Sequence, residues 1–328
     1  MKSVTLDPHS NYVYTLFVWS ASDCSPNRDG GTGAIRTDQQ HRVFITQESF
    51  NQNIKNGLFF RTHGFGAEDG NLPPALLMGC KNEFFGPRTL RQALESVRDN
   101  IAEKVGKEGE EITGEHLFNH CFDIPLFGYV NSNGLEHPAF PHNLPGSAGL
   151  LYLPKTINRV SIENRGISNS FSQPKSDKDH SPKGMPGSHF TDYLVEGVFV
   201  TVGILNASQL RVIAKKKFGM EDPDAINKRV EELYNLYLAG IWEGYKLLGY
   251  ASTMRKGQQP VALYSLQLPQ LPDYISNPAD ALFDENGQLP LHESITDTLK
   301  KAGPKLAEWS QGGFGKSFSL VNGQDFLN

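Results

Sequence analysis

Hydrophobic positions along this chain form short runs that are apolar on both faces and longer runs with helical spacing. The run Tyr12–Trp19 is apolar at nearly every position, which is typical of a strand covered on both sides. The run from Phe190 to Leu205 also has apolar residues on both faces and predicts a central strand. A further strand is expected within Phe118–Val130, and a last one over Val261–Leu268.

Two helices are expected between the first strand and the middle of the chain. Residues from about Thr46 to Asn56 predict one helix, which Gly57 should end. Apolar residues at three- and four-residue spacing predict another over Leu90–Val105, ending at Gly106.

Two more helices are expected between the third strand and the last. One begins after Ala207-Ser208 and ends at Gly219. Asp222-Pro223 supplies an N-cap and a first-turn proline for a longer helix with a wide apolar stripe. Gly240 and Gly244 within it are expected to let that helix approach the strands closely.

Strand, helix, strand, followed later by strand, helix, strand, is the order of a ferredoxin-like or RNA-recognition-motif core. The sequence therefore predicts an α+β fold with a βαββαβ core, formed by a single domain over residues 1–328. Long glycine-, proline- and polar-rich stretches predict insertions at about 58–117, 130–150 and 172–189. Residues 269–328 are expected to form a strap and helix packed on the core or on a neighbour.

Composition describes a globular chain with an acidic balance. Of its 328 residues, 38% are hydrophobic and 20% charged, and the formal net charge is −5, so any nucleic-acid binding has to come from a local basic surface. No apolar run reaches the length of about 18 residues needed to span a membrane, which favours a cytoplasmic protein. Three widely spaced cysteines fit reduced thiols better than disulfides or a zinc site.

A long polar loop separates the first strand from the first helix. It contains, in order, Asp23, Pro26-Asn27-x-Asp29-Gly30, Arg36-x-Asp38 and Val43-x-Ile45-Thr46. This order resembles the opening block of the backbone subunit of type I CRISPR surveillance complexes, with the reduced type I-F variant systems as the nearest relatives. Further on, Cys121–Gly128 resembles the Asp-x-x-Leu-Phe-Gly strand of that family.

The chain departs from the family pattern at three places. The family's basic pair in the first helix is replaced by Phe50-Asn51, and its strand arginine by Pro125. Its Gly-Pro-Val-Gln stretch is replaced by Pro145–Gly149.

The resemblance implies a RAMP protein with an RNA-recognition core and thumb and finger or web insertions. Such a subunit is non-catalytic, needs no cofactor or metal, and polymerises along guide RNA (crRNA) as a helical homo-oligomer. Its expected partners are crRNA, copies of itself, other Cascade subunits and target DNA paired through the guide. Four residues in the opening block and first helix are then candidate RNA contacts: Asn27, Arg28, Arg36 and Lys55.

A second candidate RNA contact is the segment 158–173. Guanidinium groups suit phosphates, hydroxyl and amide groups suit sugar hydroxyls, and an aromatic ring suits stacking on a base. The candidates are Arg159, Arg165, Ser168, Asn169, Phe171 and Gln173. On a regular strand the two arginines share a face and lie about 20 Å apart. The alternative is an exposed strand with a polar face that binds nothing.

Two further basic loops are candidates. Residues 174–187 correspond to the thumb of the related subunits and carry Lys175, Lys178, Lys183 and Met185. The alternative is a solvated loop. The loop after the longest helix offers Ser252, Thr253, Arg255 and Lys256 to a phosphate, or is only a flexible basic turn. The run Lys215–Lys217 is instead interpreted as a solvated helix end that favours the helix dipole.

Catalytic alternatives rest on weaker patterns. Asp23 or Asp29 would serve a metal-dependent ribonuclease on the same fold, but no general base is identifiable beside them. His116 and His120 lack the glutamate of a zinc-protease helix, and the glycine-rich stretches at 64–66 and 312–316 lack the full P-loop pattern. A metabolic α/β enzyme with loops over a small-molecule pocket is the third alternative.

Overall fold

The computed structural model describes residues 4–24, 36, 45–63, 113–130, 143–156, 161–168, 189–251, 258–269 and 317–321. Its elements combine helices with an antiparallel sheet, so the α+β class predicted from the sequence is confirmed.

The main sheet contains six strands, and every pair in it is antiparallel. Its strands run in the order β4-β6-β1-β7-β8, and β5 pairs with β6 outside that path. Their bounds are β1 Tyr12–Cys24, β4 Ala148–Thr156, β5 Ser161–Ser168, β6 His189–Asn206, β7 Gln259–Leu268 and β8 Ser317–Val321. The predicted first, third and last strands correspond to β1, β6 and β7. The first and third are central, as their two apolar faces indicate.

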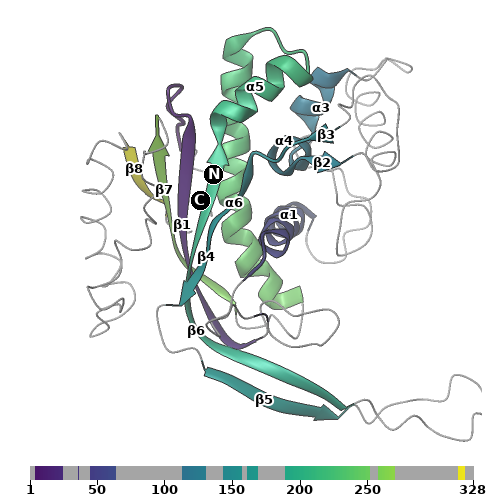
Figure 1. The fold of residues 1–328 in the computed structure, drawn as a ribbon, viewed down its shortest axis with the longest axis vertical. Helices are drawn as coiled ribbons and strands as arrows, with labels where there is room; N and C mark the ends of the chain where they lie inside the picture. The colour runs from purple at the N-terminus through teal and green to yellow at the C-terminus, as the bar shows by residue number, and fades with distance from the viewer. Residues whose placement is uncertain are drawn as a thin grey trace, which may run out of the picture.

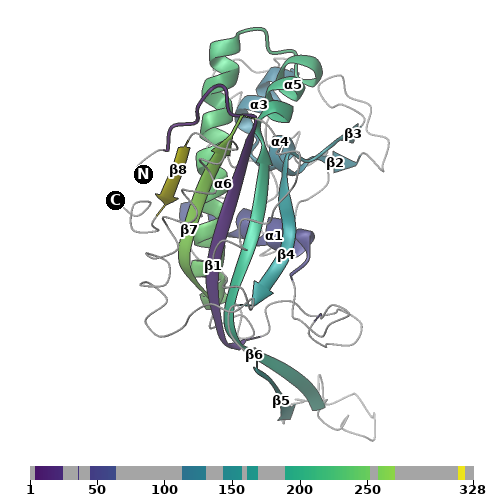
Figure 2. The ribbon, with the colours of Figure 1, turned by 60° about the vertical axis from the view of Figure 1, so that its left-hand side comes forward.

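Helices cover one face of this sheet (Figures 1 and 2). Two of them, α1 (Gln47–His63) and α6 (Pro223–Ala251), pack closely against each other. The shorter helices α3 (Gly114–His120), α4 (Asp123–Phe127) and α5 (Ala207–Lys217) lie toward one end. A small second sheet pairs β2 (Tyr129–Val130) with β3 (Asn143–Leu144).

The Asp222-Pro223 signal of α6 operates as expected, whereas α5 begins at Ala207, two residues before its expected start, with Asn206 as its N-cap. Asn206 accepts a hydrogen bond from the Gln209 N–H at 2.9 Å and caps α5, and Lys215–Lys217 lie exposed in its last turn. Pro223 is the first residue of α6, and Asp222 accepts from the Asp224 N–H at 2.9 Å. The interpretation of the lysine run as a solvated helix end is confirmed.

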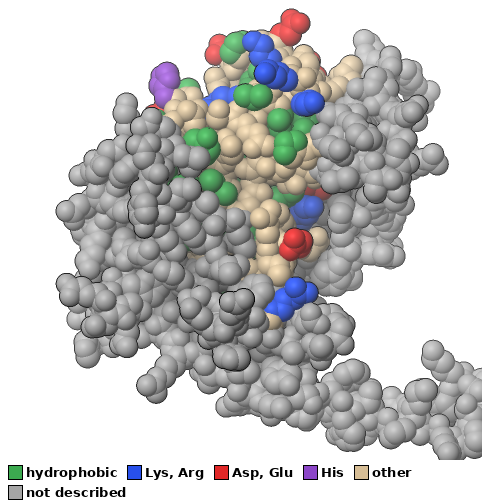
Figure 3. Space-filling view, viewed as in Figure 1, with side chains coloured by type: hydrophobic (Ala, Val, Ile, Leu, Met, Phe, Trp, Pro, Cys, Tyr) green, Lys and Arg blue, Asp and Glu red, His purple; other side chains and the backbone are tan. Residues whose placement is uncertain are grey.

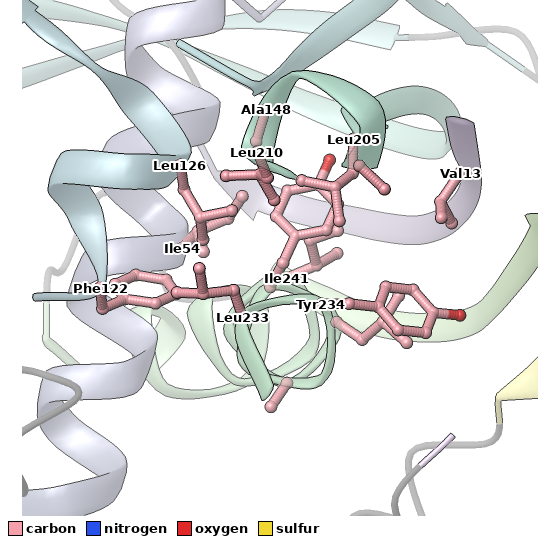
Figure 4. Packing of buried hydrophobic residues seen from close by; sticks show 14 of the residues in the cluster. Val13, Ile54, Phe122, Leu126, Ala148, Leu205, Leu210, Leu233, Tyr234 and Ile241 are labelled. Carbon is pink, nitrogen blue, oxygen red and sulfur yellow. The ribbon is translucent and has the colours of Figure 1, made fainter. Parts of the chain in front are cut away.

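The core lies between the sheet and α6. The Trp19 ring of β1 stacks on Phe199 of β6 with 4.3 Å between ring centroids, and its indole N–H donates to Thr201 at 2.9 Å. Figure 4 shows side chains from several elements converging here, among them Ile54 of α1, Leu126 of α4 and Ile241 of α6. Distant parts of the sequence are therefore joined in one apolar core.

Three expectations are wrong. The strand expected within Phe118–Val130 is mostly helical, because Asp123 starts α4 and Pro125 occupies its first turn. Helix α1 continues through Gly57 to His63, since the glycine faces a close helix contact rather than a turn. Gly244 approaches the backbone of α1 at Asn53 and not a strand. The helix expected over Leu90–Val105 lies outside the described residues.

Candidate nucleic-acid interface

A two-stranded ribbon extends from the main sheet. Residues 189–196 of β6 pair with β5, whereas β1 pairs with β6 at Val195 and from Gly197 to Asn206, so that no residue of β6 before Val195 is paired with β1. The ribbon therefore leaves the body of the sheet and projects beyond it (Figures 1 and 2). It is the most protruding described element, and its tip is formed by Ser168 and its register partner His189.

Two of the predicted RNA contacts lie on this ribbon. Arg165 is the register partner of Asp192, and Ser168 stands at the tip. Residues 169–188, which join β5 to β6, lie outside the described residues, as does Arg159. The position of the basic loop relative to Arg165 therefore stays a prediction, as does the shared face of the two arginines.

Lys55 lies on α1 and contacts α4, a different part of the fold from the ribbon. Its Nζ is 5.1 Å from the centroid of the Phe127 ring, within the range of a cation–π contact. It also lowers the pKa of Asp123 in α4. The structure thus gives Lys55 a role in holding α4 against α1.

Asp123 is fully buried at the start of α4. Burial raises the pKa of its carboxyl, against the lowering effects of Lys55 and of backbone N–H groups at Asp123 and Ile124. Among the described residues, its Oδ1 has no hydrogen-bond partner. The sequence reasoning missed this group, although an acidic residue is typical of the first turn of a helix.

Arg229 of α6 holds the turn that precedes α4. Its Nε donates to the Phe118 carbonyl and its Nη2 to the Cys121 carbonyl, both at 3.0 Å, and its Nη1 contacts Glu232 at 3.1 Å. The guanidinium is buried, and desolvation lowers its pKa. Burial likewise raises the pKa of the Cys121 thiol. This arrangement is structural, because its charged atoms satisfy backbone carbonyls.

Residues Pro145–Gly149 form a tight junction with the end of α4. Ser147 donates from its N–H to the Leu126 carbonyl at 2.7 Å. Gly128 has φ of +66° and ends α4, and a Cβ there would collide with Leu144 and Gly146. Cys121–Gly128 is therefore a turn and short helix, not the strand that its resemblance suggested.

The remaining candidates are dispersed or outside the described residues. Arg36 is described and half-buried. The candidates outside the described residues are Asn27, Arg28, Asn169, Phe171, Gln173, Lys175, Lys178, Lys183, Met185, Ser252, Thr253, Arg255 and Lys256.

Exposed lysines also gather over the end of α5, where Figure 3 shows basic side chains at the end of the molecule opposite the ribbon.

Among the residues that the structure describes, no three His, Cys, Asp or Glu side chains come together in a group fit to hold a metal ion. His116 instead accepts a hydrogen bond at its Nδ1 from the Thr113 N–H, completing a capping box at the start of α3. None of the described helices is both long and apolar enough to cross a bilayer.

Comparisons with known proteins gave structural likenesses only. No family model matches the sequence, and no curated protein matches it. One solved chain, described as "CRISPR RNA-guided surveillance complex, pre-nicking", is 13% identical with a TM-score of 0.47, covering 95% of this chain and 92% of that one. A second, described as "CRISPR RNA-guided surveillance complex", is 12% identical with a TM-score of 0.44, covering 92% and 82%. TM-scores below 0.5 leave fold and function to be argued from the residues themselves.

Proposed function

We propose that this chain is a non-catalytic backbone subunit of a CRISPR effector complex that binds guide RNA through the β5–β6 ribbon and stacks with copies of itself along that RNA. The observation that carries the proposal is the ribbon. It takes Arg165 and Ser168 beyond the body of the sheet, and both of its strands lead into the lysine-bearing segment 169–188.

The strand order supports an RNA-recognition core. Strands β1, β4, β6 and β7 lie side by side in the order β4-β6-β1-β7, with α1 between the first two in sequence and α6 before the last. If these four strands are numbered 1 to 4 in chain order, their spatial order across the sheet is 2-3-1-4, and each neighbouring pair is antiparallel. This is the arrangement of a split β-α-β unit, to which we assign the ferredoxin-like βαββαβ core.

A projecting ribbon suits a backbone subunit better than an isolated RNA binder. Its basic residues contact phosphates without reading bases, so any guide sequence fits, and base pairing with target DNA supplies the sequence specificity. Because the ribbon stands outside the core, it is also free to reach an adjacent copy on the same RNA. The partners are thus crRNA, further copies and other subunits of the complex.

The test compares three single substitutions for affinity to single-stranded RNA of unrelated sequences. Arg165→Ala removes the candidate phosphate contact and should weaken binding by about 1–3 kcal/mol. Asp192→Asn removes the negative charge at the opposing register position and should strengthen binding. Lys216→Ala, at the far end of the molecule on α5, removes one exposed positive charge and serves as the matched control.

Unchanged RNA affinity in Arg165→Ala, or an equal loss in Lys216→Ala, would refute the ribbon as the binding surface. Equal folding of all three variants is checked by circular dichroism and by the midpoint of thermal unfolding.

A further inference from the structure

The segment Val4–Asp7 lies along α6, and side chains of α6 form hydrogen bonds with the backbone of this segment. The Asn235 Oδ1 accepts from the Val4 N–H at 2.8 Å, and its Nδ2 donates to the Val4 carbonyl at 3.0 Å. The Glu231 Oε2 accepts from the Leu6 N–H at 2.9 Å. These contacts depend on main-chain groups, so they require an extended segment and not one particular side-chain sequence.

A side chain of β7 also forms hydrogen bonds with the backbone of the same segment. The Gln267 Oε1 accepts from the Asp7 N–H at 2.9 Å, and its Nε2 donates to the Thr5 carbonyl at 2.9 Å. Two amide side chains and one carboxylate thus make five hydrogen bonds to four consecutive residues. We call the surface formed by Glu231, Asn235 and Gln267 the strap channel.

Apolar side chains alternate along the segment as they do in a bound strand. Leu6 is 4% exposed and joins the core, Val4 is half-buried against it, and Thr5 between them is exposed. Inward apolar residues at every second position and main-chain hydrogen bonds between them are the features of extended-peptide recognition.

Emptying the strap channel would raise the free energy of the folded chain. Asn235 is 7% and Gln267 4% exposed, so both amides would lose buried hydrogen bonds if the segment left, and the apolar site of Leu6 would open to water. Whatever replaces the segment has to offer the same main-chain pattern and apolar spacing. A second copy of the chain carries such a segment.

The link to the core allows that exchange. Ser10 donates to the Asp7 carbonyl at 2.9 Å across a turn in which Pro8 and His9 are exposed. Asn11 is then anchored by its N–H to the Leu268 carbonyl at 3.0 Å. Ser10 itself is buried, its hydroxyl donates to the Gln267 Oε1 at 3.4 Å, and its carbonyl accepts from the Arg211 Nη1 at 2.8 Å. Opening the turn therefore frees residues 7–9, which span up to about 10 Å when extended, while Ser10, β1 and the channel stay in place.

We propose that the strap channel accepts residues 4–7 of a second copy of this chain, so that copies exchange their N-terminal segments. The exchange replaces each internal contact by an identical contact between copies and needs only the turn at Pro8 to open. It goes beyond RNA binding and does not depend on it. Reciprocal exchange joins two copies, and one-way exchange joins copies head to tail.

Cross-linking between singly substituted copies tests the exchange. In a background with Cys24 and Cys80 replaced by serine, one copy carries Thr5→Cys and a copy of different mass carries Glu231→Cys. A chain with both cysteines calibrates the short bifunctional thiol reagent within one copy. Val212→Cys, an exposed α5 position, replaces Thr5→Cys as the collision control. The Glu231 substitution removes one of the five hydrogen bonds and leaves both amides in place.

After the two copies are refolded together, we expect the Thr5–Glu231 pair to cross-link between copies at least tenfold more than the Val212 control. If the double-cysteine chain cross-links internally while the mixed copies give no more product than the control, the exchange is refuted.

A peptide experiment measures the channel directly. A fluorescent peptide of residues 1–7 is titrated into the chain lacking those residues, and a Leu6→Asp peptide serves as the control. Saturable binding of the first peptide with at least tenfold weaker binding of the second supports the proposal, and equal or no binding to the folded, truncated chain refutes it. If the truncated chain does not fold, the cross-linking result decides.

Discussion

Gly57 of α1 and Gly244 of α6 meet backbone to backbone where the two helices cross. A Cβ on Gly57 would fall on the Gly244 backbone, and one on Gly244 would fall on the Asn53 carbonyl. The crossing therefore depends on the absence of both side chains. Helix α1 also contacts β4 of the sheet, so the crossing lies between the sheet-covering parts of both helices.

We expect Gly57→Ala and Gly244→Ala each to lower the free energy of unfolding by about 1–3 kcal/mol, because overpacking against backbone atoms forces the helices apart. The gain in helix propensity from glycine to alanine is smaller, up to about 1 kcal/mol. Urea unfolding measures both. Lys228→Ala, exposed on α6, is the control, and a stabilised Gly57→Ala variant would contradict the close crossing.

The buried carboxyl of Asp123 predicts a pH dependence of stability. Burial raises its pKa in the folded chain above the ordinary value of 3.8, so the stability contributed by the protonated form is present below that value and is lost as the pH rises through the raised pKa. Asp123→Asn should therefore unfold at higher urea concentration than the parent chain at pH 7.

The difference should shrink as the pH falls toward 4. Glu221→Gln, at an exposed position, should leave the curve unchanged. A lower stability of Asp123→Asn at pH 7 would show instead that the charged carboxylate, with Lys55 and its backbone donors, outweighs its desolvation.

The reactivity of the Cys121 thiol measures how firmly Arg229 holds the turn that precedes α4. Removing the guanidinium leaves the buried carbonyls of Phe118 and Cys121 without their donors, so Arg229→Met should cost about 2–4 kcal/mol of unfolding free energy. In the Cys24→Ser, Cys80→Ser background, the Cys121 thiol should react slowly with a thiol reagent in the parent chain and faster in the variant. Equal rates in the two chains would mean that Arg229 does not hold this turn.

Sequence periodicity predicted most of the long elements and missed β4 and the short ones. Runs such as Tyr12–Trp19 and the stripe of α6 are long enough for period and caps to agree, so β1, β6, β7, α5 and α6 were found. Strand β4 was hidden in a glycine- and proline-rich stretch, and β8 is only five residues long. Short pieces like α4 are fixed by tertiary partners, here Arg229 and Lys55, which no local pattern contains.

The candidate site divides in the same way. Basic residues on a polar strand indicated the ribbon, because residue type and alternation are local properties. Its projection from the sheet could not be predicted, since it follows from where β6 changes partners along its length. Lys55 was a candidate because the resemblance implies RNA contacts in the opening block and first helix, and its contact with Phe127 depends on α4, which was expected to be a strand.

Catalysis is a separate question from binding. We expect purified protein incubated with guide-length RNA and Mg²⁺ or Mn²⁺ to leave the RNA intact, because no general base is identifiable in the sequence beside Asp23 or Asp29. Gel analysis of labelled RNA measures this. Metal-dependent cleavage that Asp29→Ala abolishes would favour the ribonuclease alternative over a structural subunit.

Salt dependence gives the sharpest test of how the ribbon binds. If Arg165 neutralises one phosphate, the plot of log affinity against log salt concentration for single-stranded RNA should lose about 0.7 from its slope in Arg165→Ala. Lys216→Ala should keep the parent slope, because its lysine lies at the opposite end of the molecule. Affinities for unrelated RNA sequences should fall together, since phosphate contacts carry no base information. A strong preference for one sequence with little change in slope would mean that the ribbon reads bases, and the proposed guide path would then be wrong.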